Sequence, residues 1–199
     1  MIIALCGYMG AGKSTVGRYL ANLLYAPFVD LDEYICQQAG KSIPEIFAES
    51  GESAFRALEQ KCLQELLCKY GSDCELKMPE SMVAKGLEEE FETIDHEVEK
   101  ISCVISVGGG TPTNPACAQM LRTQTLCFYL KASLESVQKR LWKNHAQRPL
   151  LEGKGRKELN EYVSSMIAER EPAYLACSRS IISTENKSIS DIALEIANF

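Results

Sequence analysis

The sequence predicts an α/β fold in which a parallel sheet of five strands is covered by helices on both faces. Short apolar runs alternate along the chain with segments of helical periodicity, and a glycine-rich turn follows the first run. The chain has 199 residues, and single cores stop growing near roughly 250–300 residues. We therefore expect one domain over residues 1–199.

Each expected element follows from its local pattern. Apolar or β-branched runs predict strands over residues 2–6, 28–32, 101–107, 126–130 and 180–183. Apolar residues at helical spacing predict helices over residues 13–24, 53–69, 133–142, 159–168 and 189–199. Residues 42–45 (SIPE) resemble a helix start, because they place a proline and an acid in the first turn.

Composition narrows the class of protein. Apolar residues make up 46% and charged residues 24%, which is typical of a globular protein rather than a disordered or collagen-like one. The net charge of −6 argues against a nucleic-acid partner. No apolar run reaches about 18 residues, so no membrane span is expected. The apolar N-terminus has no basic leader, so we do not expect a signal peptide.

An acidic segment interrupts the alternation. Residues 71–100 contain ten acidic residues and three lysines, and we expect a solvated helix or loop there. The nine cysteines include no C-x-x-C pair, and only two histidines accompany them, which argues against a zinc site. Several of these cysteines lie in apolar runs, as at Cys6, Cys103 and Cys127. This usage predicts free thiols in a reducing, cytoplasmic compartment.

Residues 7–14 (GYMGAGKS) fit the phosphate-loop pattern G-x-x-x-x-G-K-[ST] without a mismatch. Glycines allow backbone N–H groups to turn toward phosphate oxygens, and the following helix adds partial positive charge at its N-terminus. Lys13 is then placed to reach the β- and γ-phosphates, and Ser14 to ligate Mg²⁺. Residues 186–189 (NKSI) lack the aspartate of a guanine-reading N-K-x-D motif. A small kinase is the leading class.

Two further patterns indicate an acceptor site. Asp30 and Asp32 are two residues apart at the end of a predicted strand, so both side chains are expected on one side. One would serve near the metal and one as a base for a substrate hydroxyl; capping of a following helix is the alternative. Arg56 and Glu59 are three apart on a predicted helix, so Glu59 is able to orient the guanidinium toward a carboxylate. A surface ion pair is the alternative there.

Two glycine-containing segments complete the pattern. Residues 108–110 are three glycines after a buried strand, which indicates close approach of backbone N–H groups to a ligand, with a tight turn as the alternative. Residues 143–157 are basic and contain glycine, so they are expected to be a lid that closes over a triphosphate. A plain solvated loop is the alternative for that segment.

Taken together, these motifs resemble those of the shikimate kinases, within the nucleoside-monophosphate-kinase-like group. The matching pieces occur in the family's order: residues 7–15, Asp30-Leu-Asp32, residues 42–47, residues 51–59 with Phe55-Arg56-x-x-Glu59, residues 108–110, residues 148–151 (RPLL) and Arg170-x-Pro-x-Tyr174. The resemblance implies a three-layer P-loop NTPase fold of the nucleoside-monophosphate-kinase type with a lid at about 143–158. We expect a monomer.

The resemblance implies an activity and its residues. ATP would donate its γ-phosphoryl group to the 3-hydroxyl of shikimate, with Mg²⁺, in chorismate and aromatic amino acid biosynthesis. The implied catalytic residues are Lys13, Asp32 and Arg148. The implied ATP contacts are Gly10, Ala11, Gly12, Lys13, Ser14, Thr15, Arg140 and Arg148. The implied shikimate contacts are Asp32, Arg56, Gly108, Gly109 and Arg170. Ser14, and Asp30 through water, would hold the metal.

Two alternatives stay open. Another small-molecule kinase, such as a gluconate kinase or a nucleotide kinase, would share the phosphate loop but does not predict Phe55-Arg56-x-x-Glu59 together with Asp30-x-Asp32. A nucleotide-binding regulator that has lost transfer is the second, and the intact Lys13, Ser14, Asp32 and Arg148 argue against it. The chain departs from the family in residues 71–100, which are longer and more acidic than usual, and in Thr111, where a small apolar residue is common.

Overall fold

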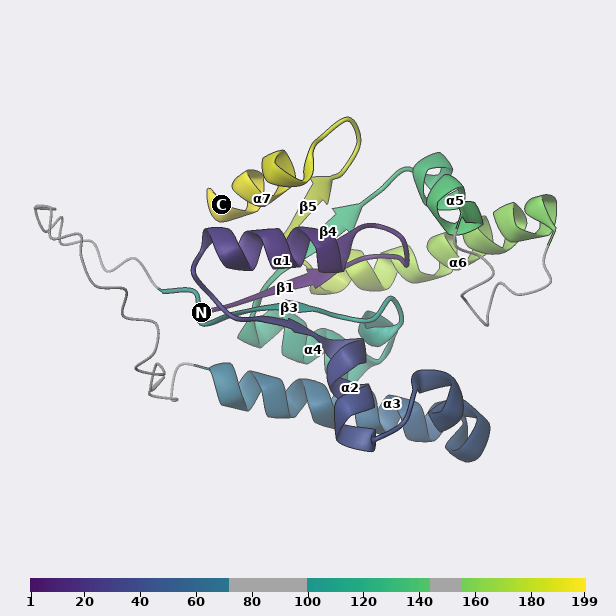
Figure 1. Cartoon of the computed structure of the whole chain (residues 1–199), viewed down its shortest axis with the longest axis horizontal. Coiled ribbons are helices and arrows are strands. Elements are labelled where there is room, and N and C mark those ends of the chain that lie inside the picture. Colours follow the sequence, from purple (N-terminus) through teal and green to yellow (C-terminus); the bar gives the residue numbers. More distant parts are fainter. Residues whose placement is uncertain (72–99, 144–154) are drawn as a thin grey trace, which may run out of the picture.

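A computed structural model describes residues 1–71, 100–143 and 155–199 (Figure 1). Five strands form one sheet in the order β2-β3-β1-β4-β5, and every adjacent pair is parallel. The strands are β1 (Ile2–Cys6), β2 (Phe28–Asp30), β3 (Cys103–Ser106), β4 (Leu126–Lys131) and β5 (Ser180–Ser183). The predicted five-stranded parallel sheet is confirmed, with β2 and β3 shorter than their apolar runs.

Helices occupy the connections between the strands, and a last helix follows β5. They are α1 (Lys13–Leu23), α2 (Leu31–Ala39), α3 (Ile43–Tyr70), α4 (Pro115–Gln124), α5 (Leu134–Lys143), α6 (Arg156–Cys177) and α7 (Ile189–Ala197), with a short 3₁₀ turn, η2 (Thr111–Thr113). The predicted start at Ser42 is confirmed, because the carboxylate of Glu45 accepts hydrogen bonds from the backbone N–H and the hydroxyl of Ser42. Helix α3 bends at Gly51, where φ is +77°.

The sheet is the middle layer of three (Figure 1). Alternate residues of β1 point to opposite faces. Ile3 and Leu5 pack with α1 and α7, whereas Ala4 and Cys6 face the core shared with α3, α4 and α6. All five residues of β1 are buried, as expected for a central parallel strand.

The structure differs from the predicted elements in several places. Helix α6 extends well beyond residues 159–168 and continues through Pro172. The predicted strand over residues 28–32 ends at Asp30, where α2 begins. Helices α2 and α4 were not predicted. Most of the predicted acidic segment (71–100) and lid (143–158) lies outside the described residues. None of the described helices is long and apolar enough to cross a membrane.

Candidate active site

The phosphate loop joins the end of β1 to the start of α1. Gly10 and Gly12 have φ angles of +80° and +96°, which favour glycine. The ammonium group of Lys13 donates hydrogen bonds to the carbonyls of Gly7 at 2.8 Å and Tyr8 at 3.2 Å. The loop is therefore curled around its own lysine at the N-terminus of a helix, as an anion site requires.

A cleft of about 510 Å³ opens over this loop. Its floor is made by residues 9–16, and Asp30, Asp32 and Gly109 line it as well. Arg140 of α5 lines the same cleft and donates a 2.9 Å hydrogen bond to the carbonyl of Gly10. The structure thus brings together the described residues predicted to contact ATP. Arg148 lies outside the described residues.

Asp30 has two structural roles. One carboxylate oxygen accepts a 2.6 Å hydrogen bond from the hydroxyl of Ser14. The other accepts from the backbone N–H groups of Asp32 at 3.1 Å and Glu33 at 3.5 Å, so Asp30 is the N-cap of α2. The expectation that Asp30 and Asp32 share one side of a strand was therefore wrong, because the chain becomes helical at Leu31. Both carboxylates still line the cleft.

Asp32 lies in an environment that disfavours its charge. Burial, with the neighbouring charge of Asp30, raises the pKa of Asp32 to about 6, while Lys13 opposes the shift. The side chain also approaches Gly108 closely: a Cβ atom there would lie 2.8 Å from an Asp32 carboxylate oxygen. A carboxylate with this pKa is well suited to accept a proton near neutral pH.

Arg56 is held by a buried carboxylate. Its guanidinium donates to Glu59 at 2.8 Å, and the Glu59 side chain is only 1% exposed. The second oxygen of Glu59 accepts a 2.6 Å hydrogen bond from the buried hydroxyl of Thr111. The surface ion pair considered above is thereby excluded. The guanidinium packs on Gly110, where a Cβ atom would lie 2.5 Å from it.

Helix α6 carries two further groups to the same glycines. The hydroxyl of Tyr174 donates a 2.6 Å hydrogen bond to the carbonyl of Gly109. A guanidinium nitrogen of Arg170 lies 3.9 Å from the position of a Cβ at Gly109. Sequence reasoning missed the buried hydroxyl of Thr111 and the contact of Tyr174 with Gly109. The only signals for them were the threonine after the glycines and a tyrosine one turn after Arg170.

A phosphate loop between a strand and a helix defines a P-loop protein. The carboxylates and arginines beside the cleft make it a kinase that acts on a small molecule. The family model described as Shikimate kinase matches residues 9–72 and 82–199. The chain belongs to the shikimate kinase family and is an ATP-dependent kinase of the shikimate pathway. Residues 1–8 and 73–81 lie outside the match, and residues 73–81 fall within the acidic segment.

Individual relatives agree with this assignment. A shikimate kinase of Chlorobaculum tepidum is 36% identical over 193 residues, covering 94% of this chain and 84% of the relative. The crystal structure of shikimate kinase from Bacteroides thetaiotaomicron has a TM-score of 0.78 at 29% identity, covering 100% of this chain and 97% of the other. The enzyme from Acinetobacter baumannii, solved in complex with shikimate, has a TM-score of 0.76 at 28% identity, covering 99% and 90%.

Proposed function

We propose that this chain transfers the γ-phosphoryl group of ATP to the 3-hydroxyl of shikimate, giving shikimate 3-phosphate and ADP. One observation carries the residue assignment. Asp32, Arg170 and Arg56 all approach residues 108–110, which lie beside the cleft over the phosphate loop. A carboxylate next to two guanidinium groups fits an acceptor that has both hydroxyls and a carboxylate.

The nucleotide would bind over the phosphate loop. Backbone N–H groups of residues 10–15 and the ammonium group of Lys13 would neutralise its phosphates, and Arg140 would contact it from α5. Ser14 and Asp30 fit a magnesium site, because a hydroxyl and a carboxylate 2.6 Å apart offer the oxygen ligands that Mg²⁺ prefers. Ser14 would bind the ion directly and Asp30 through water. Bound Mg²⁺ supplies positive charge to the transferring phosphates.

The acceptor would bind against residues 108–110. Arg56 and Arg170 would hold its carboxylate, and Gly108 and Gly109 would line the pocket. Asp32 would accept the proton of the 3-hydroxyl as that oxygen attacks the γ-phosphorus and ADP leaves. Lys13, with Arg148 on a lid of residues 143–158, would stabilise the charge that develops during transfer.

We further propose an assembly state, a compartment and a set of ligands for this chain. The chain would act as a monomer in the cytoplasm, with ATP and shikimate as its ligands and no nucleic-acid partner. The net charge of −6 supports the last point.

A coupled assay of ADP release tests the proposal. We expect ADP to form with shikimate and not with gluconate or a nucleoside monophosphate. If either of those acceptors stimulated ADP release as strongly as shikimate, the chain would be a kinase of the other class. ATP binding without shikimate-dependent ADP release would indicate a regulator. Lys13→Ala is expected to abolish transfer, and calorimetric titration of shikimate with a nonhydrolysable ATP analogue would show whether that variant still binds the acceptor.

A further inference from the structure

A buried tyrosine bonds to the glycine that lies against both the phosphate loop and Arg170. The hydroxyl of Tyr174 donates a 2.6 Å hydrogen bond to the carbonyl of Gly109, and Tyr174 is buried. A Cβ atom at Gly109 would lie 3.4 Å from the backbone nitrogen of Met9 and 3.9 Å from a guanidinium nitrogen of Arg170. Tyr174 therefore contacts the backbone where the proposed donor and acceptor sites meet.

The peptide that follows Gly109 has little else in its own sequence to restrain it. Residues 108–110 are three glycines, and glycine has the freest backbone of any residue. A peptide plane between two glycines rotates readily unless a hydrogen bond holds it. In a planar trans peptide the carbonyl of Gly109 and the N–H of Gly110 point in opposite directions. A bond to the carbonyl therefore fixes the direction of both groups.

We propose that Tyr174 is a positioning residue for the acceptor. Its hydroxyl holds the peptide between Gly109 and Gly110 in the orientation that places shikimate at the correct distance from the phosphate loop. This role rests on the function proposed above, and it gives Tyr174 no contact with either substrate. Arg170 and Tyr174 are four residues apart on α6, so one face of that helix supplies both the guanidinium group and the bond to Gly109.

The tyrosine is itself held in place. Its ring packs against that of Tyr129, with the ring centroids 5.2 Å apart and the planes inclined by 38°. The hydroxyl of Tyr129 donates to Glu171 at 3.2 Å, so the two tyrosines have different partners. Burial raises the pKa of Tyr174 above its ordinary value, and its hydroxyl therefore stays protonated and able to donate.

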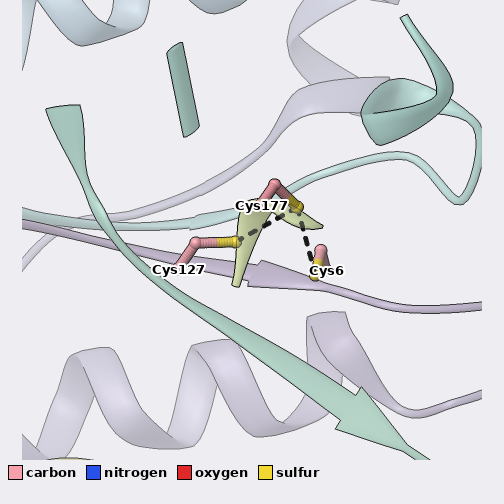
Figure 2. A group of neighbouring side chains, drawn as sticks. All are labelled: Cys6, Cys127 and Cys177. Atoms are coloured by element: carbon pink, nitrogen blue, oxygen red, sulfur yellow. Dashed lines mark hydrogen bonds between the residues drawn. The ribbon is translucent and has the colours of Figure 1, made fainter. Parts of the chain in front are cut away.

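Three buried cysteines pack the end of α6 onto the sheet (Figure 2). The sulfur of Cys177 lies 4.0 Å from the sulfurs of Cys127 in β4 and Cys6 in β1. The Cys177 thiol also donates to the backbone carbonyl of Tyr174 at 3.5 Å. Because Cys6 directly precedes Gly7 of the phosphate loop, the helix end that carries Tyr174 contacts the strand that leads into this loop.

Tyr174→Phe tests the proposal, because it removes the hydroxyl and keeps the ring. Since a small displacement of the acceptor slows transfer, we expect kcat/KM for shikimate to fall about tenfold or more. The KM for ATP should change little. Tyr129→Phe is the matched control, because it removes a buried hydroxyl from the same ring pair. It should lose comparable stability in chemical denaturation and keep the kinetics of the unchanged protein.

A second measurement reports on the peptide itself and needs no turnover. Consecutive glycines occur in this sequence only at residues 108–110. Protein made by cell-free synthesis with glycine labelled at its carbonyl carbon and its nitrogen therefore gives two carbonyl–amide correlations in NMR spectra, one for each Gly-Gly bond. The carbon signal of the Gly109 carbonyl should move upfield in Tyr174→Phe and keep its position in Tyr129→Phe.

The same correlations give the affinity for the acceptor. Shikimate titrated against them yields a dissociation constant, which should rise about 3- to 10-fold in Tyr174→Phe, as expected for the loss of one hydrogen bond. Tyr129→Phe should bind shikimate as the unchanged protein does. Circular dichroism would verify that both variants are folded.

The unchanged protein separates this proposal from the proposed function. If it neither bound shikimate nor released ADP with it, both would be wrong. If it were active, and folded Tyr174→Phe matched Tyr129→Phe in kcat/KM and in the dissociation constant, the role of Tyr174 alone would be wrong. An unmoved Gly109 carbonyl signal in folded Tyr174→Phe would also overturn that role. So would a correlation of Gly109 with Gly110 that saturating shikimate left in place in the active, unchanged protein, and that result needs no variant.

Discussion

Thr111 donates a 2.6 Å hydrogen bond to Glu59, and neither side chain is more than 1% exposed. The other oxygen of that carboxylate accepts from the guanidinium of Arg56. The η2 turn that follows the three glycines is thereby tied to the helix that presents an arginine to them. Through Glu59, Thr111 thus helps to position Arg56, which we propose contacts the acceptor.

Thr111→Val tests this link by removing the hydroxyl while keeping the side-chain shape. A buried carboxylate oxygen then loses its partner, which costs about 1–3 kcal/mol of stability. We expect a lower melting temperature and a higher KM for shikimate, with the KM for ATP little changed. Thr123→Val is the control, because that hydroxyl is exposed on α4 and bonds only to a backbone carbonyl. A change in the KM for ATP without a change in the KM for shikimate would contradict the role assigned to Thr111.

Arg56→Lys tests the proposed contact with the acceptor's carboxylate. Lysine keeps the charge but not the planar pair of N–H donors that binds a carboxylate through two bonds. A hydrogen bond to a charged group contributes about 1.5–3 kcal/mol, so the KM for shikimate should rise roughly 10- to 100-fold. Arg122→Lys, an exposed arginine on α4, is the matched control. Steady-state kinetics measure this effect. An unchanged KM for shikimate would show that Arg56 does not contact the acceptor.

Local patterns predicted most of the fold. The boundaries of β1 were predicted to the residue, because a short, fully buried apolar run is followed at once by the glycines of the phosphate loop. The predicted end of the second strand was wrong because Asp30 both ends β2 and caps α2. Helix α4 was missed because only Cys117 and Leu121 of its residues are buried, which leaves a weak periodic signal.

The site was only partly predictable from spacing. Arg56 and Glu59 are neighbours on one helix, so their contact follows from helical geometry. The approach of Arg56 and Arg170 to the same glycines does not follow from geometry within one element. It depends on how α3 and α6 pack against the sheet, and only the family resemblance predicted it. The cluster of Cys6, Cys127 and Cys177 depends on the same packing, and no local motif indicates it.

Ser14→Ala tests the proposed magnesium site. The change removes the hydroxyl that bonds to Asp30 and would ligate the ion. We expect a lower kcat at standard magnesium concentrations and a higher magnesium concentration for half-maximal rate, because one oxygen ligand is lost. Magnesium titrations of initial rate measure both effects. Ser164→Ala, on the exposed face of α6, should titrate as the unchanged protein does, and an identical magnesium requirement in Ser14→Ala would contradict the assignment.

The raised pKa of Asp32 predicts that the kcat/KM for shikimate depends on pH. Burial and Asp30 raise its pKa to about 6, and a base must be deprotonated to accept a proton. The kcat/KM for shikimate should therefore fall tenfold per pH unit below about pH 6. Carbon NMR of labelled aspartate identifies the group directly: one carboxyl signal should titrate near pH 6 and be absent from Asp32→Asn. A signal that titrates near pH 4 and disappears in that variant would exclude the raised pKa.

Asp32→Asn is also expected to make the protein more stable while abolishing transfer. The folded-state pKa of about 6 lies above the ordinary value of 3.8, so the folded protein binds the proton more tightly than the unfolded chain. The stability associated with the protonated form is complete below about pH 4 and is lost as the pH rises through 6. At pH 8 the ionised carboxylate therefore destabilises the fold, and the neutral amide should restore roughly 1–3 kcal/mol.

Chemical denaturation of Asp32→Asn at pH 8 and pH 4 measures this difference, which should shrink at the lower pH. Asp191→Asn is the control of opposite sign, because hydrogen bonds from Ser188 lower the pKa of that carboxyl at the start of α7. Losing its charge should destabilise the protein at pH 8. If Asp32→Asn instead lowered stability at pH 8, the carboxylate would be a structural partner, and its place as the base of the reaction would have to be given up.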